Sequence, residues 1–267
     1  MPLVVILSVV ATAIISAFNI RTISQIWIIP ASFAAGVIIF SLLFWLVLWL
    51  TCFYIPVMKE YKKPSRTYQK LLNIGYWFLC TAARIKPHIT GLDKIPKDRR
   101  FLFVSNHLSR FDNMVQSIAL RKTPLAFVSK PSNFKIPVGR HLITRCCYIP
   151  IDRDNPKNAM KAINRAAELI SSDYVSVGIY PEGHRGTGCD LQEFRAGCFK
   201  VAQKAKCPIV VATIFGTEKI HKNFPFHRTD VYLDILECVE IGSEKTTEVA
   251  PKIKKIMQEN LNNYKEK

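Results

Sequence analysis

The N-terminal part of the chain is a nearly uncharged segment, which limits what it can fold into. Residues 26–58 contain no charged side chain, and residues 2–18 form a shorter uncharged run before them. A helix needs about 20 apolar residues to span a bilayer, and about 17 is the lower limit. The second run is long enough and the first just reaches the limit, with a polar break at residues 19–25. The sequence therefore predicts a membrane helical hairpin over residues 1–58.

The charges are concentrated in the rest of the chain. Of 37 lysines and arginines and 20 aspartates and glutamates, only Arg21 lies within residues 1–58. An apolar segment joined to a basic body suits a partner that is both hydrophobic and negatively charged, such as a membrane with anionic lipids. Five basic residues follow the second run: Lys59, Lys62, Lys63, Arg66 and Lys70. By the positive-inside rule we expect the body on the cytoplasmic side, and a hairpin lying within one leaflet stays open as an alternative.

Residues 67–86 have the pattern of an amphipathic helix with an aromatic belt. The belt consists of Tyr68, Tyr76, Trp77 and Phe78. Such rings favour the membrane–water boundary, but an ordinary helix that faces a core shows the same pattern. Both interpretations stay open, and we expect residues 59–87 to form an amphipathic interfacial connector.

Strand and helix patterns alternate in the remainder of the chain. Strand-like runs occupy residues 101–105, 125–129, 147–151, 174–180, 208–215 and 231–239. Helix-like runs occupy residues 113–121, 156–171, 195–206 and 246–264. Alternation of this kind is typical of an α/β fold, here with a mixed, largely parallel central sheet flanked by helices. We expect one α/β domain over residues 88–267.

The sequence shows no metal-binding pattern. None of the eight cysteines forms a CxxC pair, and no histidine spacing matches a zinc site. We therefore expect no metal and no resident cofactor, with reduced thiols in a body that faces the cytosol.

A histidine and an aspartate follow the first strand-like run, five positions apart. His107 and Asp112 would lie on opposite faces of a strand, and roughly 140° apart on a helix. They can meet only if the chain turns between them, and Asn106, Ser109 and Asp112 favour a turn before a helix. The carboxylate could then accept a hydrogen bond from one imidazole nitrogen and leave the other free as a base. From the spacing alone, a surface turn with a capping aspartate is the plainer interpretation.

Charged residues also follow two other strand-like runs. Glu182, Gly183 and Arg185 belong to a glycine-rich loop whose backbone N–H groups can approach a ligand closely. Arg153 follows the run that ends at residue 151, and arginine is suited to a forked contact with phosphate. Ligands of open α/β sheets lie at the carboxyl ends of the strands. One anionic ligand could therefore meet the base and both arginines.

Four segments, in this order, resemble blocks of the glycerolipid acyltransferases, specifically the 1-acylglycerol-3-phosphate acyltransferases. The segments are residues 106–112 (NHLSRFD, like NHxxxxD), residues 139–153, residues 180–185 (YPEGHR, like FPEGTR) and residues 207–211 (CPIVV, like VPIVPV). The resemblance covers roughly residues 88–240. His184 and Gly186 depart from the usual Thr and Ser, in the block that holds the acceptor.

The resemblance implies a membrane-bound enzyme that moves an acyl group from acyl-CoA or acyl-carrier protein to the 2-hydroxyl of lysophosphatidic acid, giving phosphatidic acid. It makes His107 the general base and Asp112 its orienting partner. The implied substrate-binding residues are Glu182, Gly183, Arg185, Arg153 and Lys130. No metal is required.

Other functions stay open beside this one. The same chemistry could act on another lyso-acceptor, such as a lysophospholipid, a lyso-ornithine lipid or dihydroxyacetone phosphate. A lipid hydrolase could use the same His–Asp pair. A non-catalytic basic protein could bind membrane surfaces or nucleic acid, but the sequence lacks a basic recognition helix and RNA-binding motifs, so we expect no nucleic-acid partner.

Overall fold

The computed structural model describes residues 2–53, 55–57, 59–152, 155–242 and 244–265. The chain divides into two compact units, Met1–Pro56 and Val57–Lys267. The first unit contains two helices, α1 (Pro2–Asn19) and α2 (Ile28–Phe53), and a short 3-10 turn, Ile23–Gln25, between them.

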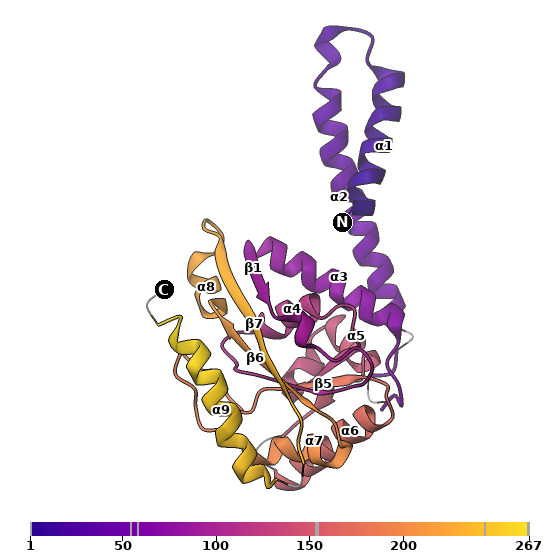
Figure 1. Ribbon diagram of the computed structural model, residues 1–267. Helices are drawn as coiled ribbons and strands as arrows, with labels where there is room; N and C mark the ends of the chain where they lie inside the picture. Colours follow the sequence, from indigo (N-terminus) through magenta and orange to yellow (C-terminus); the bar gives the residue numbers. More distant parts are fainter. Residues whose placement is uncertain (1, 54, 58, 153–154, 243, 266–267) are drawn as a thin grey trace. The chain divides into compact units, whose positions relative to one another are not determined.

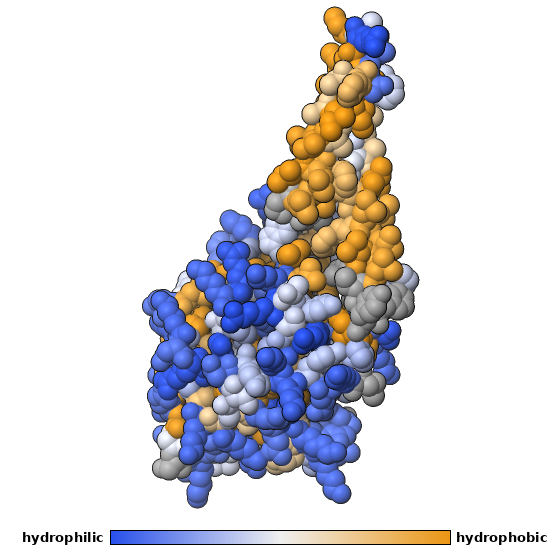
Figure 2. All heavy atoms as spheres, turned by 90° about the vertical axis from the view of Figure 1, so that its right-hand side faces the viewer, coloured by the Kyte–Doolittle hydropathy of each residue, from blue (hydrophilic) through white to orange (hydrophobic). Residues whose placement is uncertain are grey.

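The first unit is a helical hairpin with an apolar outer surface. Its two helices lie side by side (Figure 1), and Gly36 allows a close approach, since an added Cβ would lie 3.2 Å from the Cβ of Ser8. In the view of Figure 2, hydrophobic side chains cover most of the hairpin, and hydrophilic ones gather at the turn between its helices. By length and composition the segment Ile23–Val47 could cross a membrane, whereas α1 is apolar but shorter. The hairpin predicted from the sequence is present.

The second unit is built on a mixed β-sheet. Within the described residues, the strand order is β1-β7-β6-β2-β5-β3-β4, with β7 antiparallel to β6 and the other neighbours parallel. The strands are β1 (Ile85–Thr90), β2 (Leu102–Ser105), β3 (Leu125–Ser129), β4 (Ile149–Pro150), β5 (Ser176–Ile179), β6 (Ile209–Phe215) and β7 (Thr229–Val239). Every residue of β2, β5 and β6 is buried, which is typical of parallel strands covered on both faces.

Helices flank this sheet (Figure 1). They are α3 (Arg66–Ala82), α4 (Asp112–Ala119), α5 (Gly139–Arg145), α6 (Pro156–Ser171), α7 (Lys200–Ala205), α8 (Ile220–Asn223) and α9 (Thr246–Asn262). At the start of α6, the Asn155 side chain accepts hydrogen bonds from the N–H groups of Lys157 and Asn158, as a helix cap does. The predicted fold class, a mixed and largely parallel sheet with flanking helices, is confirmed.

Several boundaries differ from the sequence prediction. The helix expected over residues 67–86 ends at Ala82, because Arg84 adopts a φ of 57° and the chain continues as β1. β1 is an edge strand with polar residues and Pro87, so it lacks the apolar run of a central strand. The helices α5 and α8 are too short to show a clear period.

The parallel strands determine where a site can form. β2, β3, β5 and β6 run in the same direction, so their carboxyl ends share one edge of the sheet. We call it the carboxyl edge. The segments that follow Ser105, Ser129, Ile179 and Phe215 all start there.

Candidate active site

His107 and Asp112 meet at the carboxyl edge. β2 ends at Ser105, the chain turns, and α4 begins at Asp112. The Asn106 amide fastens this turn to β6, because it donates to the carbonyl of Ile214 and accepts from the N–H of Ile214, both at 2.8 Å. The Nδ1 atom of His107 lies 2.7 Å from Oδ2 of Asp112. The predicted contact between imidazole and carboxylate is therefore confirmed.

The carboxylate of Asp112 is fully buried and receives four hydrogen bonds. Its Oδ2 accepts from the His107 ring and from the backbone N–H groups of Leu108 at 2.6 Å and Ser109 at 2.8 Å. Its Oδ1 accepts from the hydroxyl of Thr217 at 2.5 Å. Because the carboxylate can only accept a hydrogen bond from Nδ1 of His107, Nδ1 carries the hydrogen and Nε2 keeps a lone pair. No described residue forms a hydrogen bond with Nε2.

Three further contacts hold His107 in place. Its N–H donates to Oε1 of Glu182 at 2.9 Å, and its carbonyl accepts from the N–H of Gly186 at 2.7 Å. Its ring stacks on Tyr180, with centroids 4.2 Å apart and planes inclined by 8°. The Tyr180 hydroxyl in turn donates to Oε1 of Gln116 at 2.9 Å. The imidazole is thus positioned by the hydrogen bonds of the His107 backbone, by the stacking of its ring on Tyr180 and by the contact of Nδ1 with Asp112.

Glu182 and Gly183 shape the loop that follows β5. Glu182 is 3% exposed, and its second oxygen accepts from the N–H of Gln192 at 3.1 Å. Gly183 has a φ of 78°, its N–H donates to the carbonyl of Tyr180, and an added Cβ would lie 2.9 Å from Nε of Arg195. The carboxylate of Glu182 and the N–H of Gly183 are thus bonded within the protein, and the substrate contact expected for these two residues stays a prediction.

Burial affects the ionisation of two groups beside His107. Burial raises the pKa of the Glu182 carboxyl, and the hydrogen bonds that it accepts from the backbone N–H groups of His107 and Gln192 lower that pKa in part. Burial and the charge of Asp112 raise the pKa of the Tyr180 hydroxyl. Tyr180 therefore presents a neutral ring to the imidazole and does not compete with it as a base.

Basic side chains gather on the same loop. His184 and Arg185 are exposed, and Nη2 of Arg195 lies 3.5 Å from Nε2 of His184. Within the described part of the chain, neither arginine has a carboxylate partner. Both can therefore face an anion, and the forked guanidinium group suits phosphate.

Two further ligand residues, Lys130 and Arg153, are predicted from the sequence. Lys130 is exposed directly after β3, two strands from β2 at the same edge. Arg153, predicted as a further phosphate contact, lies outside the described residues.

An apolar cavity of about 140 Å³ adjoins the pair. Tyr180 lines it and also stacks on His107, so the cavity begins one ring away from the imidazole. The other lining residues are mostly apolar: Val128, Ile151, Ala159, Ala162, Ile163, Ile179, Pro181, Gly183, Arg195, Gly197 and Cys198. Arg195 places a cation at its wall.

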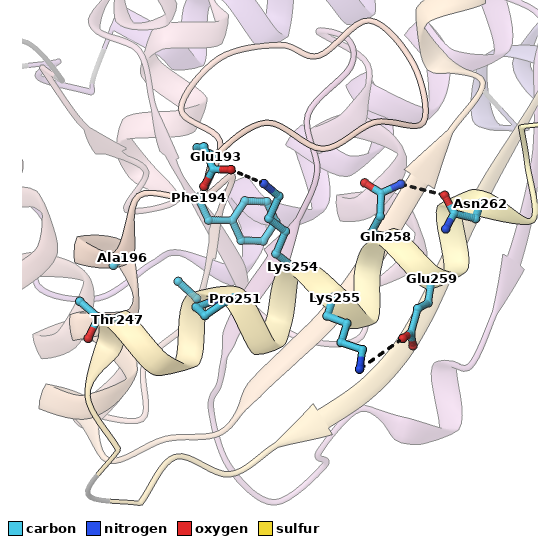
Figure 3. A pocket seen from close by; sticks show the side chains of 11 residues that line it. Glu193, Phe194, Ala196, Thr247, Pro251, Lys254, Lys255, Gln258, Glu259 and Asn262 are labelled. Atoms are coloured by element: carbon cyan, nitrogen blue, oxygen red, sulfur yellow. Dashed lines mark hydrogen bonds and ion pairs between the residues drawn. The ribbon is translucent and has the colours of Figure 1, made fainter.

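A larger groove, of about 650 Å³, lies along α9 and contains neither His107 nor Asp112 (Figure 3). Its polar side chains bond mainly to one another. Lys254 pairs with Glu193 at 2.7 Å, and Lys255 lies 4.0 Å from Glu259. We assign the groove no role in the site. The described residues also contain no group of three His, Cys, Asp or Glu that could hold a metal ion.

A family comparison agrees with this geometry. Residues 86–214 match the family model described as Acyltransferase. Over this range, just under half of its length, the chain is similar to the acyltransferase family. The matched range includes both residues of the His107–Asp112 pair and the loop after β5, and it ends before Thr217.

Individual acyltransferases show the same relation. A 1-acyl-sn-glycerol-3-phosphate acyltransferase of Chlamydomonas reinhardtii is 29% identical over 163 residues, which are 61% of this chain and 48% of that protein. The one of Borreliella burgdorferi is 27% identical over 186 residues, 67% of this chain and 72% of that protein. The chain thus spans about half the length of the algal relative.

A solved structure shares the fold. The crystal structure of the 1-acyl-sn-glycerophosphate acyltransferase PlsC from Thermotoga maritima has a TM-score of 0.65 and is 20% identical. The match covers 100% of this chain and 98% of that chain, so it includes the N-terminal hairpin.

Three residues around the His107–Asp112 pair are not predicted from the sequence. Tyr180 belongs to a recognised block, but only the structure shows its ring against His107. Arg195 begins the helix-like run 195–206, and that pattern gives no sign of its place beside Gly183. Thr217 lies 105 residues from Asp112, and its one signal is that it follows a buried strand at the carboxyl edge.

Proposed function

We propose that the protein is an acyltransferase that moves a fatty acyl group from acyl-CoA or acyl-carrier protein to the 2-hydroxyl of lysophosphatidic acid, giving phosphatidic acid. The His107–Asp112 pair carries the proposal, because Nε2 has a lone pair and the loop beside it presents Arg185 and Arg195. Lysophosphatidic acid offers both the hydroxyl that a base can activate and the phosphate that arginines bind. The names of the relatives described above support the same acceptor.

In the proposed reaction, Nε2 of His107 accepts the proton of the acceptor hydroxyl as its oxygen attacks the thioester carbonyl carbon. A C–O bond forms, the C–S bond breaks, and the imidazolium returns the proton to the leaving thiolate. Asp112 keeps the ring oriented and stabilises its positive charge, as the carboxylate of a catalytic triad does. We assign the phosphate to Arg185 and Arg195, with Lys130 and Arg153 as further contacts, and part of an acyl chain to the apolar cavity.

We further propose that the α1–α2 hairpin anchors the enzyme and that the α/β unit works at the cytoplasmic face of the membrane. The apolar surface of the hairpin and the basic residues after it support this arrangement. Protease digestion of sealed right-side-out and inverted vesicles tests it: the α/β unit should be cleaved only in the inverted ones.

The activity is tested with purified full-length enzyme, labelled acyl donors and a panel of acceptors, with products read by mass spectrometry. Phosphatidic acid formed from lysophosphatidic acid, at a higher kcat/KM than for any other acceptor, is the expected result. Preference for another lyso-acceptor would overturn the substrate, and free fatty acid without any acylated product would indicate a hydrolase.

Replacing Glu182 with glutamine is expected to reduce the free energy of unfolding by about 1–3 kcal/mol, the cost of an unsatisfied buried N–H group. The carboxylate accepts from two backbone N–H groups, whereas an amide has only one oxygen to offer. Thermal melting of the wild type and the variant measures the effect. Glu193→Gln is the matched control, because Glu193 is exposed, and an unchanged melting temperature for Glu182→Gln with a raised KM would favour substrate contact instead.

Replacing Thr217 with valine is expected to lower kcat about 10–100-fold, because a hydrogen bond to a charged group is worth about 1.5–3 kcal/mol. The change removes the hydroxyl that Asp112 accepts from and keeps the shape of the side chain. Thr217→Ser keeps the hydroxyl and should restore most of kcat, with KM for the acceptor similar in both variants. A loss of kcat in Thr217→Ser but not in Thr217→Val would show that Thr217 acts through packing of its methyl group and not through its hydroxyl.

A further inference from the structure

The connection between β6 and β7 presents two aromatic side chains to the outside. Phe224 is 54% exposed and Phe226 is 80% exposed, more than the other large hydrophobic residues described in the α/β unit. Single exposed apolar residues are common on proteins, but two large rings around one proline, at the tip of one loop, form a concentrated apolar feature. We call residues 223–228 the Phe loop.

The Phe loop is held in a fixed shape. The N–H of Phe224 donates to the carbonyl of Ile220 at 2.9 Å, and the N–H of His227 donates to the carbonyl of Asn223 at 2.8 Å. The Asn223 side chain donates to Oγ1 of Thr229 at 3.0 Å. A loop with these internal bonds can present its rings without first losing conformational freedom, which reduces the entropy cost of binding.

Positive charge surrounds the two rings. Lys219, Lys222 and Arg228 are the charged residues from position 219 to position 229, and no acidic residue lies between them. Two carboxylates bracket this stretch: that of Glu218 accepts from the N–H of Gly216 at 3.0 Å, and that of Asp230 is paired with His88 at 2.6 Å. Exposed aromatic rings with flanking lysine and arginine are the combination that binds the boundary of an anionic bilayer.

The Phe loop lies on the side of the sheet where the reaction is proposed. It belongs to the segment that leaves β6 at the carboxyl edge, and the same segment contains Thr217, which bonds to Asp112. Nη1 of Arg84 donates to the carbonyl of Pro225 at 3.3 Å, which joins the loop to the end of α3. Figure 1 shows α3 and α8 at the same end of the α/β unit.

The helix α3 adds a second apolar surface next to this loop. It buries Leu72, Tyr76 and Cys80 against the α/β unit and leaves Trp77 44% exposed on another face. One face of α3 therefore packs as a core-facing helix does, and the interfacial interpretation stays a prediction for the exposed face. A tryptophan at the membrane–water boundary is a common interfacial anchor.

We propose that the Phe loop inserts Phe224 and Phe226 into the headgroup boundary of a bilayer that contains anionic lipids. This contact docks the carboxyl edge on the membrane in addition to the hairpin. Its use in catalysis rests on the proposed function, since the acceptor would enter the site from the lipid surface. The contact itself does not depend on that activity.

The first test is photo-crosslinking of the full-length protein in vesicles of phosphatidylethanolamine and phosphatidylglycerol. Phe226→p-benzoylphenylalanine should give lipid adducts on irradiation, and Tyr174→p-benzoylphenylalanine, an exposed site before β5, should give at least several-fold fewer. Equal yields of lipid adducts at the two positions would overturn the proposal, and so would a probe at position 226 that forms adducts only with protein. The readout needs no enzyme activity, so it stands even if the proposed reaction fails.

The second test separates docking from chemistry. Phe224→Ser with Phe226→Ser should raise the apparent KM for an acceptor in vesicles about tenfold or more, because burial of one phenylalanine is worth at least a factor of ten. Turnover of a water-soluble short-chain acceptor should stay unchanged. In the control Tyr174→Ser, both the KM for the acceptor in vesicles and the turnover of the soluble acceptor should stay unchanged. An equal loss with both acceptors would show that the Phe loop supports the fold and not the membrane contact.

Discussion

Replacing His107 with alanine is expected to lower kcat/KM for acyl transfer by about 10²–10⁴-fold, the usual contribution of a positioned general base. Nε2 is the ring nitrogen left to take a proton, since Nδ1 is bound to Asp112. Donor consumption and formation of the acylated product, measured at saturating donor, give the result. The variant should stay in the membrane fraction, because the hairpin is unchanged.

The control for this substitution is another histidine in a similar setting. His88 forms a pair with Asp230 at 2.6 Å and stacks on Tyr232 with centroids 4.7 Å apart, but it lies on the edge strand β1. His88→Ala should leave kcat/KM unchanged. If His107→Ala kept most of the activity, the general-base mechanism would be wrong, and if both variants lost it equally, the loss would reflect the fold.

The sequence predicts the fold well where apolar runs are long and buried. The run that became β6 is buried at every position, and a short apolar run rich in β-branched residues is typical of a buried strand. β1 is missed for the opposite reason, because an edge strand that contains Pro87 buries too little to leave an apolar pattern. The same physics explains why short helices such as α8 escape prediction.

The sequence predicts the centre of the site better than its surroundings. The His107–Asp112 contact is local, so the spacing and the turn formers allow it, and the resemblance of residues 106–112 to a family block favours it over a surface turn. The direction of a side chain on a loop depends on distant parts of the chain. Glu182 is buried and accepts from the backbone of His107, 75 residues away, whereas Arg185, three positions later on the same loop, is exposed. Only the order of the strands brings Thr217 to Asp112, and no periodicity encodes that order.

The variant Asp112→Asn separates the charge of this residue from its hydrogen bonds. The amide oxygen can replace Oδ2 toward His107, Leu108 and Ser109, and the amide nitrogen can donate to Thr217, whose hydroxyl can reverse its role. The turn should therefore survive while the negative charge beside the imidazolium is lost. We expect kcat to fall by about 10²–10⁴-fold, similar to the loss of the base itself, with little change in KM for the acceptor.

A double-mutant cycle gives this prediction its sharpest form. If Asp112 acts only through the imidazole, Asp112→Asn should cost almost nothing further in a His107→Ala background, because residues that act as a unit are strongly non-additive. The two single variants and the double variant are compared by kcat/KM under identical donor and acceptor concentrations. Thermal melting of all three checks that the turn before α4 is intact. A double variant whose losses multiply would show that Asp112 contributes to the reaction independently of His107, and the roles assigned to the pair would then have to be separated.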